Sequence, residues 1–275
     1  MGRPFIKMHG LGNDFVVIDA REQAFRPSLD QARLIADRRM GIGCDQLIVL
    51  EPSPRADVFM RIYNADGSQA EACGNATRCI ASRLITETGS QDIRIETVAG
   101  LLQGRSAGDG LYTVDMGEAH FDWRDIPLAH ACDTLAMPLQ LGPLSNPVGV
   151  NVGNPHAVFF SADCEAVALA ELGPQLEHHP LFPERANIEI VSITEPNHIR
   201  MRVWERGGGI TLACGSGACA VAVAAARRQL TERTVTVSMD GGPVGICWRE
   251  DNHLEMTGPV ATSFSGELPV EPQGG

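Results

Sequence analysis

Two similar cysteine motifs constrain this chain more than any other feature of its sequence. The first is Ala72-Cys73-Gly74-Asn75, and the second, 141 residues later, is Ala213-Cys214-Gly215-Ser216. When this offset is applied to the whole chain without gaps, Gly12-Asn13 falls on Gly153-Asn154. The chain is therefore an internal duplication, and we expect two similar halves that face one another across a pseudo-two-fold axis. Each half supplies one cysteine, which suits chemistry on both sides of one atom.

Other polar residues recur at the same offset without being identical. Gln46 falls on Asn187, and Asn64 falls on Glu205. An asparagine in a glycine turn, such as Asn13, is commonly a residue that satisfies its own backbone. Its recurrence as Asn154 favours ligand binding instead.

The length of the chain supports the same division. With 275 residues, of which 44% are hydrophobic, the chain can bury two cores of ordinary domain size. We expect a first domain at 1–117 and a second at 118–261. Apolar and polar residues alternate over several short segments, which predicts mainly antiparallel strands. The fold class is therefore α/β of the α+β type.

Four helices are expected among these strands. A capping box at Ser28-Leu29-Asp30-Gln31 begins a helix that continues to about Arg39. A second helix follows Cys73 and ends at Gly89, a plausible left-handed C-terminal residue. A short helix is expected around 166–172, and a very apolar one over 218–226.

Charge and hydropathy exclude several classes of partner. The net charge of −12 repels polyanions, so we expect no nucleic-acid partner. The longest apolar run, 218–226, is far shorter than the roughly 20 residues that a membrane-spanning helix needs. No signal-peptide core precedes the polar residues near the start, so a cytoplasmic protein is expected.

Cofactor chemistry finds little support in the sequence. Eight cysteines in a reducing compartment are expected to be free thiols, and none has the C-x-x-C spacing of a zinc site. Lys7 is the single lysine, so it alone could form a Schiff base with pyridoxal phosphate. It lies in a short strand-like segment without a phosphate-binding glycine loop. We expect neither a metal nor a cofactor.

Cys73 and Cys214 are each expected at a helix N-terminus. There the helix dipole lowers the pKa of a thiol, and unpaired amides can hold a carboxylate. Taken singly, a free cysteine is most often a small buried hydrophobe. We assign that packing role to the other six, namely Cys44, Cys79, Cys132, Cys164, Cys219 and Cys247.

These motifs resemble those of the diaminopimelate epimerases over nearly the full length. The resemblance rests on Gly12-Asn13-Asp14-Phe15, Gly43-Cys44-Asp45-Gln46, Asn64-Ala65-Asp66-Gly67-Ser68, the two cysteine motifs, Gly153-Asn154-Pro155-His156 and Trp204-Glu205-Arg206-Gly207. It implies an isomerase that interconverts LL- and meso-2,6-diaminopimelate without a cofactor, on the way to lysine and peptidoglycan precursors. It also implies two curved sheets, each wrapped around a central helix, with the active site in the cleft between them. In this arrangement the tail 262–275 returns to the first domain.

The resemblance also implies roles for individual residues. Cys73 and Cys214 would be the catalytic acid–base pair, and His156 and Glu205 would adjust their pKa values. The substrate would be bound by Asn13, Gln46, Asn64, Gly74, Asn75, Asn154, Asn187, Glu205, Arg206, Gly215 and Ser216. We expect a homodimer that acts on a small molecule.

Two positions depart from the family pattern, and three alternatives stay open. Ile210 stands where glutamate is usual, and Ala76 where glycine is usual. A proline racemase-like enzyme would also use two cysteines, whereas a thiol redox sensor would need no polar residues around them. A pure binding protein would leave the paired thiols unexplained.

Overall fold

The computed structural model describes residues 2–269, which form two compact units. The first unit comprises residues up to 114 together with those from 259 onward, and the second comprises 115–258. Part of the tail 262–275, namely 270–275, lies outside the described residues.

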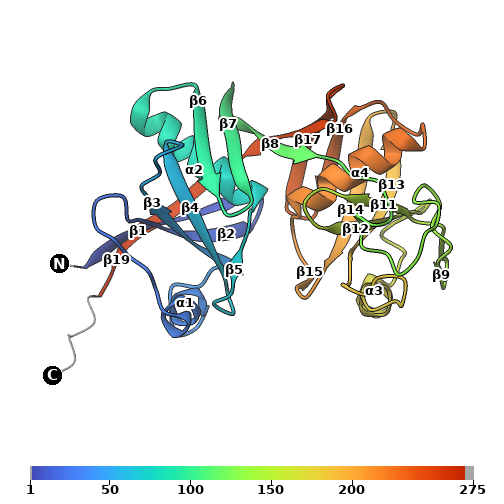
Figure 1. Cartoon of the computed structure of the whole chain (residues 1–275), viewed down its shortest axis with the longest axis horizontal. Helices are drawn as coiled ribbons and strands as arrows, with labels where there is room; N and C mark the ends of the chain where they lie inside the picture. The colour runs from blue at the N-terminus through green and yellow to red at the C-terminus, as the bar shows by residue number, and fades with distance from the viewer. Residues whose placement is uncertain (1, 270–275) are drawn as a thin grey trace. The chain divides into compact units, whose positions relative to one another are not determined.

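The first unit is a curved mixed sheet with a helix on each face (Figure 1). Its strands follow the order β19-β1-β2-β3-β4-β6-β7-β8, with short β5 beside β4, and the pairs β2/β3 and β4/β6 are parallel. The elements are β1 (Arg3–Gly10), β2 (Asn13–Asp19), α1 (Leu29–Ala36), β3 (Gln46–Glu51), β4 (Val58–Asn64), β5 (Gln69–Ala70), α2 (Gly74–Thr88), β6 (Asp92–Thr97), β7 (Gly100–Gly108), β8 (Leu111–Glu118, which crosses into the second unit) and β19 (Ala261–Leu268).

The second unit repeats the part of this arrangement that runs from β1 to β8. Its order is β11-β12-β13-β14-β16-β17-β18, with β15 beside β14, and the parallel pairs β12/β13 and β14/β16 stand at the equivalent places. The elements are β9 (Gln140–Leu141), β10 (Leu144–Ser145), β11 (Val148–Asn151), β12 (Pro155–Phe160), α3 (Leu169–Glu177), β13 (Asn187–Glu195), β14 (His198–Glu205), β15 (Gly209–Ile210), α4 (Gly215–Arg227), β16 (Thr234–Met239), β17 (Gly242–Trp248) and β18 (His253–Pro259). The predicted duplication and fold class are confirmed.

In the first unit both faces of the sheet are buried. Along β2, Phe15 and Val17 belong to the core that α2 covers, whereas Val16 and Ile18 belong to the core under α1. Successive side chains of a strand point to opposite faces, so a strand covered on both sides must be apolar throughout. This requirement explains why β2 and β3 contain unbroken hydrophobic runs.

The central helix of the second unit is buried almost all round. Apart from Ser216, every residue from Gly215 to Ala225 is buried. Since these side chains are mostly alanine, glycine and valine, strands on several sides can approach the helix closely. A helix that is apolar on all sides must lie inside a core.

Helix α1 begins as predicted and ends earlier. The side chain of Ser28 accepts the backbone N–H of Gln31, and the Gln31 side chain accepts that of Ser28, which confirms the capping box. The helix stops at Ala36, three residues before the predicted Arg39. Asp37 has extended backbone angles, and its carboxylate accepts two backbone N–H groups of the following turn.

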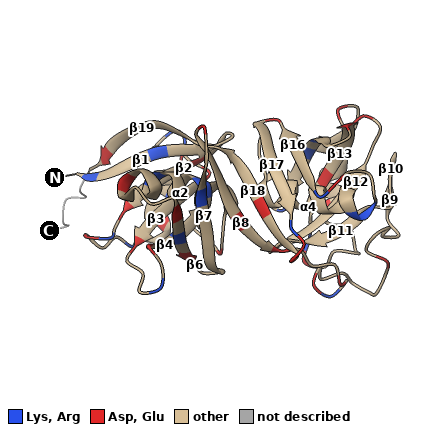
Figure 2. Cartoon of the chain, turned by 90° about the horizontal axis from the view of Figure 1, so that it is seen from above, with Lys and Arg blue, Asp and Glu red and all other residues tan. Residues whose placement is uncertain are grey.

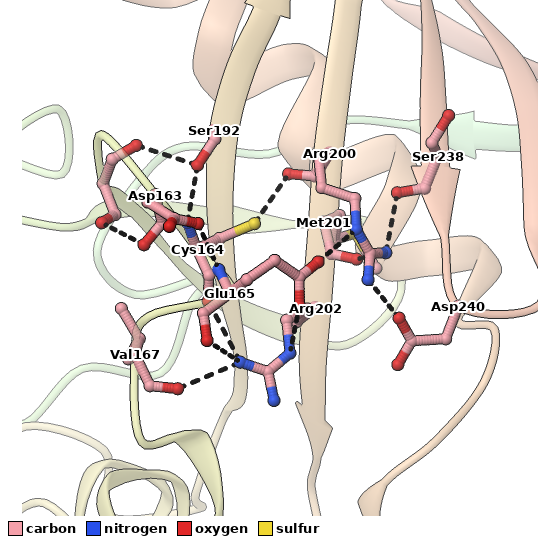
Figure 3. Close-up of polar contacts among 11 residues, drawn as sticks. Asp163, Cys164, Glu165, Val167, Ser192, Arg200, Met201, Arg202, Ser238 and Asp240 are labelled. Atoms are coloured by element: carbon pink, nitrogen blue, oxygen red, sulfur yellow. Dashed lines mark hydrogen bonds and ion pairs between the residues drawn. The ribbon is translucent and has the colours of Figure 1, made fainter.

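Helix α3 lies further along the chain than the predicted 166–172. The carbonyl groups of Cys164 and Val167 accept hydrogen bonds from Nη1 of Arg202 at 3.1 and 3.0 Å (Figure 3). Arg200, on the same strand, binds Glu165 at 2.7 Å and also pairs with Asp240. These contacts from β14 hold the segment before α3 as a loop, so the helix starts only at Leu169.

The charged residues are not confined to one element or to one unit. Lysine and arginine residues are spread over elements of both units and are interspersed with acidic ones (Figure 2). Among residues 2–269, no helix combines the length and hydropathy that a membrane crossing requires.

The repeat allows a matched test of packing against a central helix. A methyl group on Gly104 of β7 would lie 2.5 Å from Cβ of Ala81 in α2, whereas one on the equivalent Gly245 would have nothing closer than 3.8 Å. We expect Gly104→Ala to lower the free energy of unfolding by about 1–3 kcal/mol, because it overpacks the core. Gly245→Ala is the control, and it should be neutral or slightly stabilising.

The measurement is urea unfolding followed by circular dichroism, because all three tryptophans lie in the second unit and would not report on the first. Equal midpoints for the two variants would contradict the packing argument.

Candidate functional site

In the first unit, the candidate polar residues lie at strand ends. Asn13 begins β2, Gln46 begins β3 and Asn64 ends β4, and Gln46 is the register partner of Asn64. Nε2 of Gln46 donates to Oδ1 of Asn64 at 3.0 Å, and Nδ2 of Asn64 donates to Oγ of Ser68 at 3.1 Å. The sheet thus brings these two predicted residues into direct contact.

Cys73 lies at the N-cap of α2, as predicted. It is half-buried, and its Sγ is 3.8 Å from Oδ1 of Asn13. The same oxygen accepts a hydrogen bond from Nδ2 of Asn75 at 3.1 Å. Three predicted residues therefore meet at this helix terminus, where Gly74 and Asn75 contribute first-turn amides that have no partner within the helix.

A charged network that we did not predict lies behind Asn13. Nδ2 of Asn13 donates to Oδ2 of Asp45 at 2.9 Å, and Arg38 bridges Asp45 and Asp14. Buried Lys7 pairs with Asp14 at 2.7 Å. Burial raises the pKa of Asp14, but the hydrogen bonds from Arg38 and Lys7 outweigh it and hold that pKa well below its ordinary value. Lys7 thus has a structural role as a partner of Asp14.

In the second unit, Asn187 occupies the place that Gln46 has in the first. It begins β13 and is the parallel register partner of His156. Its Oδ1 accepts the backbone N–H of Arg206 at 2.9 Å, and its Nδ2 donates to the carbonyl of Pro155 at 3.0 Å. Buried Asn187 therefore fixes the backbone at Arg206, whose exposed side chain donates to the carbonyl of Glu184.

His156 is fully buried between two oxygen atoms. Its Nδ1 is 2.6 Å from Oε1 of Glu189, and its Nε2 is 2.8 Å from Oδ1 of Asn154. Glu189 is also fully buried. The sequence analysis missed it, although an acid inside the apolar segment 188–191, at a position where the first half has Ile48, was a usable signal.

Cys214 lies at the N-cap of α4, but the expected lowering of its pKa is wrong. Burial raises the pKa of this thiol well above its ordinary value, and the charges of Glu205 and Glu189 raise it further. Hydrogen bonds to Sγ from Gly217 N–H at 3.4 Å and with Ser216 at 3.6 Å act in the opposite direction. The loss of hydration on burial therefore raises the pKa of Cys214 by more than the helix N-terminus lowers it.

Glu205, at the end of β14, acts on this thiol through its charge and accepts a hydrogen bond from the hydroxyl of Thr211. The two departures from the family pattern lie in different units. Ile210 is exposed in β15, and Ala76 is buried in the first turn of α2.

Other cysteines are in packing environments. Burial raises the pKa of Cys79 to about 12 and that of Cys44 to about 11. A buried thiol of this kind is a small hydrophobe rather than a nucleophile. Over residues 2–269, no three His, Cys, Asp or Glu side chains are grouped as metal ligands.

Comparison with known proteins gives a consistent result. A family model described as diaminopimelate epimerase matches residues 5–121 and 148–263. The chain is 58% identical over 270 residues to the diaminopimelate epimerase of Rhodospirillum centenum, covering 98% of this chain and 93% of that protein. It is 54% identical over 266 residues to that of Acidiphilium cryptum, covering 97% and 96%.

Solved structures share the fold at low sequence identity. The phenazine biosynthesis protein of the PhzF family from Bacillus anthracis has a TM-score of 0.71 at 16% identity, with 98% of this chain and 100% of that chain covered. A probable proline racemase from Agrobacterium radiobacter has a TM-score of 0.70 at 14% identity, with 98% and 94% covered. At this identity the likeness concerns the fold alone.

The environment of Cys214 predicts how it reacts. With a raised pKa, the thiol is protonated at neutral pH and forms thiolate only at higher pH. We expect Glu205→Gln to move the pH profile of Cys214 alkylation by iodoacetamide to lower pH, because a negative charge that raises the pKa of this thiol is removed. Glu232→Gln, a change of an exposed acid, serves as control.

Peptide mass spectrometry measures the alkylation of Cys214 separately from that of the other cysteines. An unchanged profile in Glu205→Gln would show that its charge does not act on this thiol.

Proposed function

The chain belongs to the diaminopimelate epimerase family, and we propose that it uses Cys73 and Cys214 as a pair of acid–base groups on opposite faces of one α-carbon. It is an isomerase that epimerises diaminopimelate in the biosynthesis of lysine. In the proposal the substrate is the LL isomer, the product is the meso isomer, and no cofactor takes part. The meso product would also serve as a peptidoglycan precursor.

The observation that carries the mechanism is the equivalent position of the two cysteines. Each is the N-cap residue of the central helix of its own unit, directly before the first-turn amides. Those amides and the helix dipole can stabilise a carboxylate and the negative charge that develops when its α-carbon loses a proton. A thiol beside them is well placed to exchange that proton.

The proposed step is balanced in protons and electrons. The thiolate of one cysteine takes the α-proton, so an S–H bond forms, and the electron pair of the C–H bond stays on the substrate, delocalised into the carboxylate. The thiol of the other cysteine then gives its proton to the opposite face and becomes the thiolate. The configuration is inverted, and the two cysteines have exchanged their protonation states.

The remaining candidate residues are proposed to bind the substrate or tune the thiols. Amide groups and helix starts hold its polar ends, through Asn13, Gln46, Asn64, Gly74, Asn75, Asn154, Asn187, Glu205, Arg206, Gly215 and Ser216. Asn187 would act mainly by placing Arg206, since both ends of its side chain are used within the second unit. His156 would act on the second thiol, together with Glu205, whose charge reaches Cys214.

The assembly and location are also proposals. We propose a homodimer in the cytoplasm that acts on a small molecule and has no nucleic-acid or membrane partner. The net charge of −12 and the basic residues dispersed over both units argue against a nucleic-acid partner.

The two-base mechanism predicts that neither cysteine can replace the other. Cys73→Ala and Cys214→Ala should each lower the epimerisation rate at least about 100-fold, because positioned acid–base groups contribute roughly 10²–10⁴-fold. Epimerisation is measured as conversion of the LL isomer to the meso isomer, without added cofactor, because one remaining thiol could still exchange the α-proton with retention of configuration. Cys247→Ala is the control. More than a tenth of the rate remaining in either single variant would refute a strict two-base scheme.

The substrate assignment makes a separate prediction about the distal carboxylate. Arg206 is proposed to bind it, and binding energy from a remote group can position the reacting carbon. Lysine, which lacks this carboxylate, should be a very poor substrate, and Arg206→Met should lower activity on diaminopimelate far more than on lysine. Equal rates of racemisation of lysine or proline by the unmodified enzyme would overturn the assignment.

A further inference from the structure

Glu189 is a buried acid that the proposed mechanism does not use. It lies in β13 with no exposed surface, and its Oε1 is 2.6 Å from Nδ1 of His156, which is equally buried. Its other oxygen, Oε2, is buried without a hydrogen-bond partner in the part of the chain that the structure describes. Burying an incompletely bonded carboxyl group is costly, so a role beyond packing is indicated.

The first half of the chain shows that the fold does not need this polar pair. At the offset of the duplication, His156 corresponds to Phe15 and Glu189 to Ile48. Both of these residues are apolar, and both belong to the core that α2 covers. The second half therefore has a carboxyl–imidazole pair at positions where the equivalent strands of the first half have hydrocarbon side chains.

The hydrogen-bond partners fix where protons must lie. The imidazole of His156 stands between two oxygens, Oε1 of Glu189 and Oδ1 of Asn154, so a proton is needed on each contact. Two protons on this set make the carboxyl–imidazole pair neutral overall, whichever of Nδ1 and Oε1 holds the shared one. Neutrality avoids an isolated negative charge in the core.

This proton placement determines the orientation of the Asn154 amide. Its oxygen accepts from His156, and its Nδ2 has no hydrogen-bond partner among residues 2–269. Asn13, the equivalent residue of the first unit, has the opposite amide orientation. Its NH₂ donates to Asp45, while its oxygen faces Asn75 and the sulfur of Cys73.

We propose that Glu189 is a positioning residue that acts through His156 to orient Asn154, so that Asn154 presents its NH₂ group to a carboxylate oxygen of the substrate. This inference rests on the proposed function, in which Asn154 contacts the substrate. Within the second unit, the side chain of Glu189 lies close to the turn that contains Cys214. A methyl group on Gly217 would lie 3.0 Å from Oε1 of Glu189 and 3.3 Å from Sγ of Cys214.

The proximity to Cys214 raises a competing explanation that the variants must separate. If Glu189 acted on the thiol only through its charge, Glu189→Gln and Glu189→Ile would have the same effect. If it acts through hydrogen bonding, the two differ. The amide of glutamine can donate to Nδ1 of His156 and keep the proton on Nε2, whereas isoleucine cannot.

The first experiment detects the protons on His156 directly and does not depend on catalysis. Nitrogen-15 NMR of histidine-labelled enzyme without substrate should show Nε2 of His156 protonated in the wild type and in Glu189→Gln. In Glu189→Ile that signal should move toward the unprotonated range, because nothing then fixes the ring. The resonances are assigned by their loss in His156→Gln. An unprotonated Nε2 in the wild type would overturn the proposal.

The second experiment measures epimerisation of diaminopimelate. Glu189→Ile should lower kcat/KM about 10- to 100-fold, the size of effect expected for a lost hydrogen bond to a charged group. A rise in KM should make the larger contribution, because the contact exists in the bound substrate as well as in the transition state. Glu189→Gln should stay within about threefold of the wild type. Equal losses in both variants would refute positioning.

A double variant controls for folding. His156→Phe combined with Glu189→Ile copies the Phe15 and Ile48 pair of the first half, and it should unfold at a urea concentration no lower than the wild type. Its kcat/KM should nevertheless fall at least as far as that of Glu189→Ile, because the double variant also lacks His156. Wild-type kinetics in the double variant would refute the inference. Absence of epimerisation in the wild type, with His156 protonated as expected, would instead count against the proposed function.

Discussion

Burial of one apolar helix inside a strongly curved sheet is the constraint on which the rest of each unit depends. In α4 almost every side chain is buried, and in α2 the side chains of Cys79, Ile80 and Leu84 fill the equivalent core. The N-cap residue of each enclosed helix is a cysteine, Cys73 in α2 and Cys214 in α4. The cysteine that caps the helix and the polar residues at the neighbouring strand ends are placed by this packing.

The sequence was sufficient where structure depends on neighbouring residues. The capping box at Ser28 and the left-handed Gly89 that ends α2 were predicted because a few adjacent residues determine them. The start of α3 was not predictable in this way, since Arg202 from a distant strand holds the loop before it. The pKa of Cys214 was predicted with the wrong sign, because the burial of this thiol, which raises its pKa most, is not evident from the local motif.

The two halves have diverged in the groups that support equivalent residues. In the first unit a network of Lys7, Asp14, Arg38 and Asp45 holds the NH₂ of its asparagine. In the second, a buried carboxyl–imidazole pair holds the oxygen instead. The two equivalent asparagines therefore have opposite amide orientations, since Asn13 is held by its NH₂ group and Asn154 by its oxygen.

The pairing of β19 with β1 also bears on how the chain folds during synthesis. The first unit needs a strand from the end of the chain to cover the edge of β1, whereas the second is continuous in sequence. On the ribosome, the second unit can complete its sheet while β1 still has an open edge that could pair wrongly. The first unit therefore completes its sheet only after the whole second unit has been synthesised, because β19 follows that unit in the sequence.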